Sequence, residues 1–470
     1  MRLLARVWFW AALELVVLVV LACIRAKLWT YGSDTGTFAQ VVAGALHGMR
    51  DGVEDGSHFG YHWSPSLLLL WPLVALTGSA LPLQIAQAAA TVACAPLVAA
   101  LARPYAGVTL AERLGILTLL YPPLLAVGFD EFHELGLFSA LVLGMFVSAD
   151  RGRWLWFALC GLVALGLRED AALTLVFFGG ALAWIAARPA PAAGGALLDG
   201  SPRGGTLVAG TLLAAGSLAS LLVYYLAIVP RVGGWRPSHF YIYPFADGPL
   251  ALAAAPFVHP IAFARAIFTF GRLTYVLEAF VPLLFLPLRS RWALLALPGG
   301  TVVLLANSGY VWRMGDHYAA LWIPWLLVAT VMGVVTVARK ANSHAAKNWT
   351  SAAAVICVIF LIAFDPLHPL HYLHPYYHDL ADARRALNCV PENASLSTYD
   401  EWFSAVAARR PLATIDKTSG VQYLVYADDF PSDAYRLTMR PAIAREVARG
   451  EYRVLCRFGE VAAYRRKDSK

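Results

Sequence analysis

The strongest constraint in this 470-residue sequence is a series of long apolar segments that recurs along most of the chain. A helix needs roughly 20 consecutive apolar residues to cross the hydrocarbon core of a bilayer. Segments of about this kind lie near 7–26, 81–102, 111–129, 135–149, 153–167, 170–187, 206–229, 273–288, 292–307, 318–338 and 350–364. Only 14% of the residues are charged, whereas soluble domains are about a quarter charged. The sequence therefore predicts a polytopic membrane protein.

Two further features complete the predicted architecture. Residues 64–78 (SPSLLLLWPLVALTG) are apolar but short and contain prolines, which suits a re-entrant or juxtamembrane helix. We therefore expect an all-α membrane domain over residues 1–364, with about 11 transmembrane helices plus this short one. From residue 365 helical and extended patterns alternate, which predicts a small α/β domain over 365–470.

Positive charge sets the expected orientation. With the N-terminus in the cytoplasm, RGRW (151–154), RSRW (289–292) and ARKANSHAAK (338–347) all fall on the cytoplasmic side. This agrees with the positive-inside rule and makes the C-terminal domain extracytoplasmic. Positive residues on the cytoplasmic side, where they face anionic lipid, account for the net charge of +7. No nucleic acid partner is therefore expected.

Acidic residues and histidines gather on the predicted outer side, although acidic residues contribute little to topology. They lie in the loop at Asp34 and in HFGYHWSP (58–65), FDEFHE (129–134), LREDA (167–171) and YVWRMGDHYA (310–319). Ionisable groups at membrane depth are costly unless they are paired or face a wet cavity. We therefore expect these clusters to converge on one wet pocket at the outer rim of the membrane.

Several of these segments allow more than one interpretation. The spacing in FDEFHE predicts Asp130, His133 and Glu134 on one helical face, although a water-facing loop would use the same residues. The LREDA segment could be an internal ion pair that closes two helix ends. The aromatic segment 233–249 suits stacking against sugar rings or a position at the membrane interface. Cys389 and Cys456 lie in the polar tail, where an extracytoplasmic location would allow a disulfide.

The spaced residues of these clusters together resemble a known family. The motifs are Asp34-xxx-Phe38, His62-x-Ser64-Pro65, Phe132-His133-x-Leu135, Arg168-Glu169-Asp170-Ala171 and His317-Tyr318-x-Ala320 with Pro324. They resemble a bacterial family of predicted polytopic membrane proteins of unknown function. The chain departs from that pattern at Glu134-Leu135, where Pro-Glu is usual, and at Arg168, where Lys is usual. The family in turn resembles the GT-C superfamily of membrane glycosyltransferases.

The resemblance implies a fold, a reaction and a set of site residues. GT-C enzymes take a sugar from a polyprenyl-phosphate carrier, which implies a protein of the bacterial inner (cytoplasmic) membrane that acts on lipid-linked sugar and a glycan, lipid or protein acceptor. Asp34 would be the general base. No cofactor is certain, and a divalent metal held by Asp34 and Asp130 is an option. The expected catalytic residues are Asp34, Asp130, His133 and Glu134, and the expected substrate-binding residues are His62, Arg168, Glu169, Asp170, Arg313, His317 and Tyr318.

Two other classes of function are compatible with the sequence. A non-enzymatic lipid or solute transporter or flippase would use Glu14, Glu169, Asp170 and Glu278 as a proton or ion path, although the internal repeats common in transporters are not visible. A zinc-dependent membrane hydrolase would use His58, His62 and His133 as ligands. The sequence contains no Walker loop, GxSxG or HExxH motif, which argues against a nucleotide-driven pump.

Overall fold

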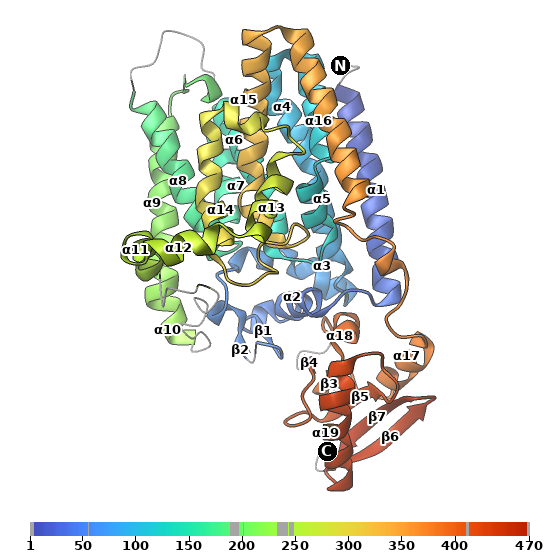
Figure 1. The fold of residues 1–470 in the computed structure, drawn as a ribbon. Helices are drawn as coiled ribbons and strands as arrows, with labels where there is room; N and C mark the ends of the chain where they lie inside the picture. The colour runs from blue at the N-terminus through green and yellow to red at the C-terminus, as the bar shows by residue number, and fades with distance from the viewer. Residues whose placement is uncertain are drawn as a thin grey trace.

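The protein consists of a bundle of helices with a small sheet beyond one end, opposite the end at which the chain begins (Figure 1). The computed structural model describes residues 4–54, 56–188, 197–200, 202–232, 243, 249–409 and 413–467. Most of the aromatic segment 233–249 lies outside these residues, so its two interpretations stay open.

Six helices in the described part of the chain are long and apolar enough to cross a bilayer. They are α1 (Leu4–Leu28), α4 (Leu81–Leu119), α8 (Glu169–Ala186), α9 (Thr206–Val223) with its continuation α10 (Val229–Val232), α15 (Ile323–Lys340) and α16 (Ser343–Ala363). The prediction of a largely helical membrane protein is confirmed.

The other predicted spans coincide with shorter helices. These are α5 (Pro122–Phe129), α6 (Phe138–Asp150), α7 (Trp154–Leu165), α13 (Phe270–Phe280) and α14 (Ala296–Leu305). Two further helices, α11 (Pro249–Val258) and α12 (Pro260–Ile267), precede α13. The count of about 11 crossings stays a prediction.

The long helix α4 turns back on itself and continues toward α5. Its backbone leaves the helical region at Gly107, where φ is 74° and ψ is 171°, a conformation that residues with a Cβ atom rarely adopt. A Cβ at Gly115 would lie 3.1 Å from Ala95 O, and one at Gly128 would lie 2.4 Å from Thr91 Oγ1. The two arms are therefore packed antiparallel, which returns the chain after α5 to the end of the bundle where α4 begins.

Aromatic side chains fill the centre of the bundle around α15. The Trp325 ring lies 6.4 Å from Phe138, 6.0 Å from Phe146 and 5.2 Å from Phe178, measured between centroids. These partners come from α6 and α8, and all four side chains are buried. A helix that is apolar on all sides, as α15 is, belongs in the interior of the bundle.

A layer of short elements covers the end of the bundle nearest the sheet (Figure 1). Helix α2 (Ser33–Ala43) follows α1, and β1 (Arg50–Asp51) pairs antiparallel with β2 (Gly56–Ser57). A 3-10 turn at Pro65–Leu70 then leads into α3 (Trp71–Thr77). The expected short helix over 64–78 is therefore present, and with its 3-10 turn it is shorter than the helices that could cross a bilayer.

The C-terminal segment forms a five-stranded sheet with helices. Its elements are α17 (Leu380–Asn388), β3 (Leu396–Thr398), α18 (Asp400–Val406), β4 (Ala413–Ile415), β5 (Tyr423–Ala427), α19 (Arg440–Ala448), β6 (Tyr452–Phe458) and β7 (Val461–Arg466). The strand order is β4-β3-β5-β7-β6. Strand β3 is parallel to β4 and β5, whereas β7 is antiparallel to β5 and β6. The alternation of helices and strands expected from the sequence is present. A disulfide between Cys389 and Cys456 joins α17 to β6.

The C-terminal segment packs directly on the loop layer. The Ser404 hydroxyl donates to Tyr31 O at 3.0 Å, and the Thr414 hydroxyl donates to Gly52 O at 2.8 Å. Helix α18 lies so close to α2 that a Cβ at Gly36 would be 2.3 Å from the Phe403 ring. The C-terminal segment therefore supports α2, which carries Asp34, and the residues just before it.

The close approach at Gly36 predicts the effect of the smallest substitution there. In Gly36→Ala the new methyl group would overlap the buried Phe403 ring and come within 3.1 Å of the Ser404 backbone. We expect a loss of about 1–3 kcal/mol, as is usual for overpacking, measured as a lower thermal unfolding midpoint and faster proteolysis between α16 and α17. Gly216→Ala is the matched control, because its Cβ would meet no atom within 4 Å. Equal behaviour of the two variants would show that α2 and α18 do not pack tightly.

Candidate functional site

Helix α2 presents Asp34 in its first turn, and Glu131 holds the start of this helix. The Glu131 carboxylate accepts hydrogen bonds from the Gly32 N–H at 2.7 Å and the Thr35 N–H at 2.9 Å. Negative charge is favoured at a helix N-terminus, where the first N–H groups have no partner within the helix. Asp34 keeps 58% of its side chain exposed. The carboxylate of Asp34 is thus on a fixed backbone and remains open to a ligand.

Gln87 of α4 fixes the segment that follows α5. Its side-chain nitrogen donates to Glu131 O at 3.1 Å, and its Oε1 accepts from the His133 N–H at 2.9 Å. The backbone is extended here, with ψ of −179° at Asp130 and 146° at His133. The expectation that Asp130, His133 and Glu134 share a helical face is therefore wrong, because Gln87 bonds the backbone groups that a continued helix would use.

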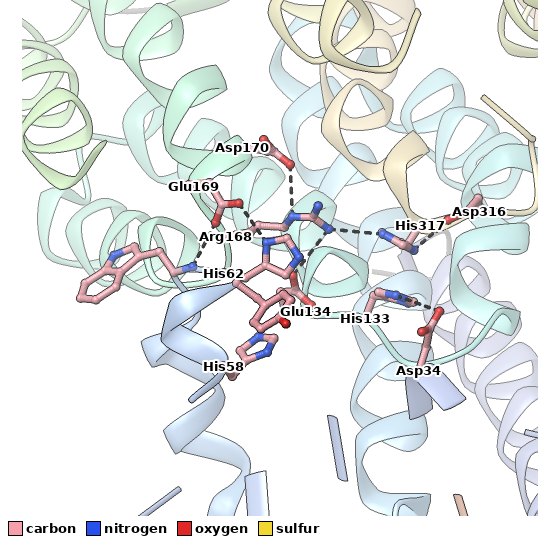
Figure 2. A network of polar contacts seen from close by, with 12 residues as sticks. Asp34, His58, His62, His133, Glu134, Arg168, Glu169, Asp170, Asp316 and His317 are labelled. Carbon is pink, nitrogen blue, oxygen red and sulfur yellow. Dashed lines mark hydrogen bonds and ion pairs between the residues drawn. The ribbon is translucent and has the colours of Figure 1, made fainter. Parts of the chain in front are cut away.

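A chain of polar contacts and one ring-stacking contact links Asp34 to Arg168 (Figure 2). Asp34 Oδ2 lies 3.4 Å from His133 Nε2, and the His133 ring stacks on the His317 ring with centroids 3.4 Å apart. His317 Nε2 lies 3.3 Å from Arg168 Nη1. Because a guanidinium only donates, this nitrogen must accept. The proton of neutral His317 is then on Nδ1, which lies 2.8 Å from Asp316 Oδ1.

Arg168 is the buried cation at the centre of this network. Its Nε lies 3.1 Å from Asp170 Oδ2, and its Nη1 lies 3.8 Å from Glu134 Oε1. The guanidinium also lies 5.0 Å from the centroid of the Tyr318 ring. Glu134 is fully buried and Arg168 is 4% exposed. The internal ion pair considered for the LREDA segment is therefore present, at the start of α8.

Glu169 connects the start of α8 to the loop layer. Its Oε1 lies 2.9 Å from His62 Nδ1, and its Oε2 accepts from the Trp63 N–H at 3.0 Å (Figure 2). His58 has a different partner, because its Nδ1 lies 2.9 Å from Glu54 Oε2. His58, His62 and His133 do not form a ligand group among the described residues, so the arrangement does not favour the zinc hydrolase alternative.

The contacts surround a cavity of about 440 Å³. Its wall includes residues from α2, the loop layer, the segments before α6 and α8, and the turn before α15. The lining residues are Asp34, Thr37, Phe38, Glu54, His58, His62, His133, Arg168, Tyr310, Asp316, His317 and Tyr318. Glu134, Glu169 and Asp170 do not line the cavity but contact residues that do.

A second depression of about 530 Å³ lies beside the cavity, between α5, α13 and α16. We call this depression the apolar groove. Asp130 and Arg313 line it, and they do not line the cavity of Asp34. Phe270 and Phe364 form part of its wall, and their side chains are 86% and 60% exposed. The two hollows approach each other at Asp316, whose carboxylate lies within 4.8 Å of that of Asp130.

Burial changes the protonation of the groups around the cavity. Partial desolvation, together with the nearby Glu131 and Asp316 carboxylates, raises the pKa of Asp34 to about 7. Burial raises the pKa of Glu134 to about 7 against the attraction of Arg168. It lowers the pKa of His133 well below the usual range, so this imidazole is neutral near pH 7.

Two sets of side chains in the described residues have the ligand types and spacing for a metal. One is Asp130, Asp316 and His317, at the junction of the cavity and the groove. The other is Asp51, Glu54 and His58. Asp34 belongs to neither set, so the pair of Asp34 and Asp130 fits a metal less well than Asp130 with the turn before α15. An ion at that junction would offset the negative charge of a phosphate group bound there.

Sequence reasoning missed several residues that shape the site. Glu131 was within a segment already singled out, yet its role depends on α2 folding back over the end of α5. Asp316 directly precedes His317 in the sequence. Nothing in the residue types around it gave a reason to select it. Glu54 and Tyr310 also line the cavity. Tyr310 begins the cluster 310–319 but was not selected within it, and Glu54 precedes the cluster 58–65.

The network around Arg168 predicts a large loss of stability when its charge is removed. In Arg168→Met the buried Glu134 and the nearby Asp170 lose their cation, and breaking a buried pair costs about 3–5 kcal/mol. The matched control is Arg339→Met, which removes an exposed pair with Asp199 and should cost about 0–1 kcal/mol. Thermal unfolding of the purified proteins in detergent measures both. Similar midpoints for the two variants would show that the Arg168 network is not structural.

Comparison with known proteins agrees with this architecture. A family model described as "Predicted membrane protein (DUF2079)" matches residues 26–454. No curated protein matches the chain. Among solved structures, ArnT from Cupriavidus metallidurans bound to undecaprenyl phosphate has a TM-score of 0.54 at 13% identity, with 97% of each chain covered. Its apo state has a TM-score of 0.53 at 13% identity, with 97% of this chain and 98% of that chain covered.

A weaker likeness is to the Archaeoglobus fulgidus oligosaccharyltransferase in complex with Zn and sulfate. It aligns at a TM-score of 0.39 and 13% identity over 93% of this chain and 71% of that one, which is too low to bear on the fold. At 13% identity the ArnT likeness extends to the fold alone, and it supports the expected GT-C resemblance. Because the family model covers most of the chain, the protein belongs to the DUF2079 family of predicted membrane proteins.

Proposed function

We propose that this protein is a membrane glycosyltransferase that moves a sugar from a polyprenyl-phosphate carrier to an acceptor outside the cytoplasm. The observation that carries the proposal is the position of Asp34. Its carboxylate is open to a cavity of about 440 Å³, next to an apolar groove, in a chain with a GT-C-like fold. The acceptor would be a glycan, a lipid or a protein.

The apolar groove suits the carrier lipid. Its exposed Phe270 begins α13 and its exposed Phe364 directly follows α16, at a surface where exposed apolar side chains would face lipid. A prenyl chain could lie there with its phosphate at the polar junction. The solved ArnT structure with undecaprenyl phosphate belongs to a protein of similar fold, which is consistent with a lipid phosphate ligand in this chain.

Arg313 is the better of the two arginines for binding the phosphate. Its side chain is exposed and lines the groove. Arg168, by contrast, is buried and already lies beside Asp170 and Glu134. Since Asp316 N–H donates to Arg313 O at 3.0 Å, a phosphate at Arg313 would sit where the groove meets the cavity. The sugar would then extend toward Asp34.

The proposed chemistry needs one proton acceptor and one stabilised leaving group. The acceptor hydroxyl attacks the anomeric carbon and its proton passes to Asp34, while the bond from that carbon to the phosphate oxygen breaks. The polyprenyl phosphate leaves with the electron pair, and Arg313 compensates its charge. Neutral His133, 3.4 Å from Asp34, orients the carboxylate. His62, His317 and Tyr318 line the cavity and would contact the sugar.

The transporter alternative has less support from the geometry. The polar residues gather around one cavity, whose wall includes α2 and the loop layer at the end of the bundle nearest the sheet (Figure 1). A transport site usually lies near the middle of the membrane. We propose that this end faces the outside of the cell, with residues 365–470 as a separate extracytoplasmic unit.

The first test of the proposal is replacement of the base. Asp34→Asn should lower transfer of a labelled sugar from polyprenyl phosphate in proteoliposomes by about 10²–10⁴-fold, the usual value of a general base. Asp199→Asn removes a carboxylate from an exposed pair with Arg339 and serves as the control. Wild-type activity in Asp34→Asn would remove Asp34 as the base, and inactivity of the wild type with every donor would overturn the enzymatic proposal.

The second test is the dependence of the rate on pH. Asp34 must be ionised to accept a proton, so the rate should rise with pH through its pKa of about 7. An ordinary aspartate, with a pKa of about 3.9, would leave the rate unchanged down to about pH 5. Because the Asp316 carboxylate raises the pKa of Asp34, Asp316→Asn should move this rise to lower pH. A flat profile between about pH 5 and 8 would contradict the assignment.

A further inference from the structure

A second cluster of titratable groups lies at the β1–β2 hairpin, on the side of the loop layer that contacts the sheet. Asp51 ends β1, Glu54 lies in the turn, and His58 follows β2 directly. The carboxylates of Asp51 and Glu54 and the imidazole of His58 each offer an atom within 4.8 Å of the others. Asp51 is 6% exposed and His58 is 1% exposed. The proposed sugar transfer gives Asp51 no role, so this cluster requires a separate explanation.

The hydrogen bonds of the cluster are incomplete. Asp51 Oδ1 accepts from the Val53 N–H at 2.8 Å and the Glu54 N–H at 2.7 Å. Its other oxygen, Oδ2, is buried and has no hydrogen-bond partner among the described residues. Glu54 Oε2 lies 2.9 Å from His58 Nδ1. A buried carboxylate oxygen beside a second carboxylate is costly unless a cation or a proton lies between them.

We propose that Asp51, Glu54 and His58 bind a divalent transition-metal ion. Two carboxylates and one imidazole are the ligands that Mn²⁺, Fe²⁺ and Zn²⁺ accept. Two ligands of one ion can lie at most about 4.4 Å apart, twice a metal–ligand bond of about 2.2 Å, so a small inward movement of the side chains closes the site. Glu54 and His58 line the 440 Å³ cavity, which supplies a path for the ion.

The position of the cluster gives the ion a structural role. Gly52, next to Asp51, accepts hydrogen bonds from Thr414 at 2.8 Å and from Lys417 at 3.2 Å, both in the C-terminal segment. Its N–H donates to Gln40 Oε1 of α2 at 2.7 Å. An ion at Asp51 would thus stiffen the hairpin that joins α2 to the sheet. It would act whether or not the cavity performs sugar transfer.

The competing explanation is a proton shared by the two carboxylates. Burial and the neighbouring Glu54 raise the pKa of Asp51 to about 8, and burial raises the pKa of Glu54 to about 7. A cluster that holds a proton would not bind a metal at neutral pH, whereas a metal site would release the proton on binding. The two explanations therefore differ in a direct binding measurement.

The experiment is a Mn²⁺ titration of the purified, chelator-treated full-length chain in detergent, followed by the loss of the free Mn²⁺ signal in electron paramagnetic resonance. Wild type should bind Mn²⁺, and Asp51→Asn should weaken that binding by about tenfold or more. The matched control is Asp316→Asn, which alters the other acidic and imidazole cluster. It should leave the affinity at the hairpin unchanged.

Hydrogen exchange on the wild type locates the ion even if the variant fails to fold. Added Mn²⁺ should slow exchange in residues 50–58 and leave residues 313–318 unchanged. The proposal is overturned if wild type binds no Mn²⁺, if Asp51→Asn binds as tightly as wild type, if only Asp316→Asn loses binding, or if protection appears only in 313–318. Binding lost in Asp51→Asn and protection at the hairpin support it, whatever the outcome of the transfer assay.

Discussion

One buried guanidinium determines how the polar end of this membrane protein is arranged. Arg168 lies between carboxylates that come from separate elements, namely Glu134 before α6 and Asp170 in α8, and it also donates to His317 before α15. A charge in that position is stable only when such partners surround it. The ends of three helices are therefore held together by electrostatics at the point where the apolar packing of the bundle stops.

The reactive part of the proposed site is built outward from this centre. His317 accepts from Arg168, His133 stacks on His317, and Asp34 lies beside His133. Each step moves from a buried group toward an exposed one, so Asp34 meets the cavity with a defined orientation and an elevated pKa. A fold like that of ArnT supplies the frame, while the proposed activity would depend on these side chains and on the groove beside them.

Much of this arrangement follows from the sequence, because charged groups at membrane depth are stable only when they are paired with other polar groups. The clusters at Asp34, 129–134, 167–171 and 310–319 meet in one network of contacts around a cavity, as that argument requires. The spacing of residues within one segment predicted the local backbone less well. A helical face through Asp130 and Glu134 was expected, yet Gln87, more than forty residues away along the chain, holds that segment extended.

Other features could not be predicted because they depend on contacts between distant segments. The cap that Glu131 places on α2 and the pairing of β4 with β3 require the tertiary fold. The number of membrane crossings is equally hard to predict from the sequence. Several apolar helices are short, and the length of an apolar segment is the main local indication of a crossing. The separation of Arg313 from the cavity of Asp34 likewise appears only in three dimensions.

The contacts of Ser404 with Tyr31 and of Thr414 with Gly52 join positions 373 and 362 residues apart. A ribosome completes the segment that supports α2 only after every membrane helix has been made. The polar end therefore matures last during biogenesis, and a chain that stops before α18 would insert its helices yet leave α2 and Asp34 without this support.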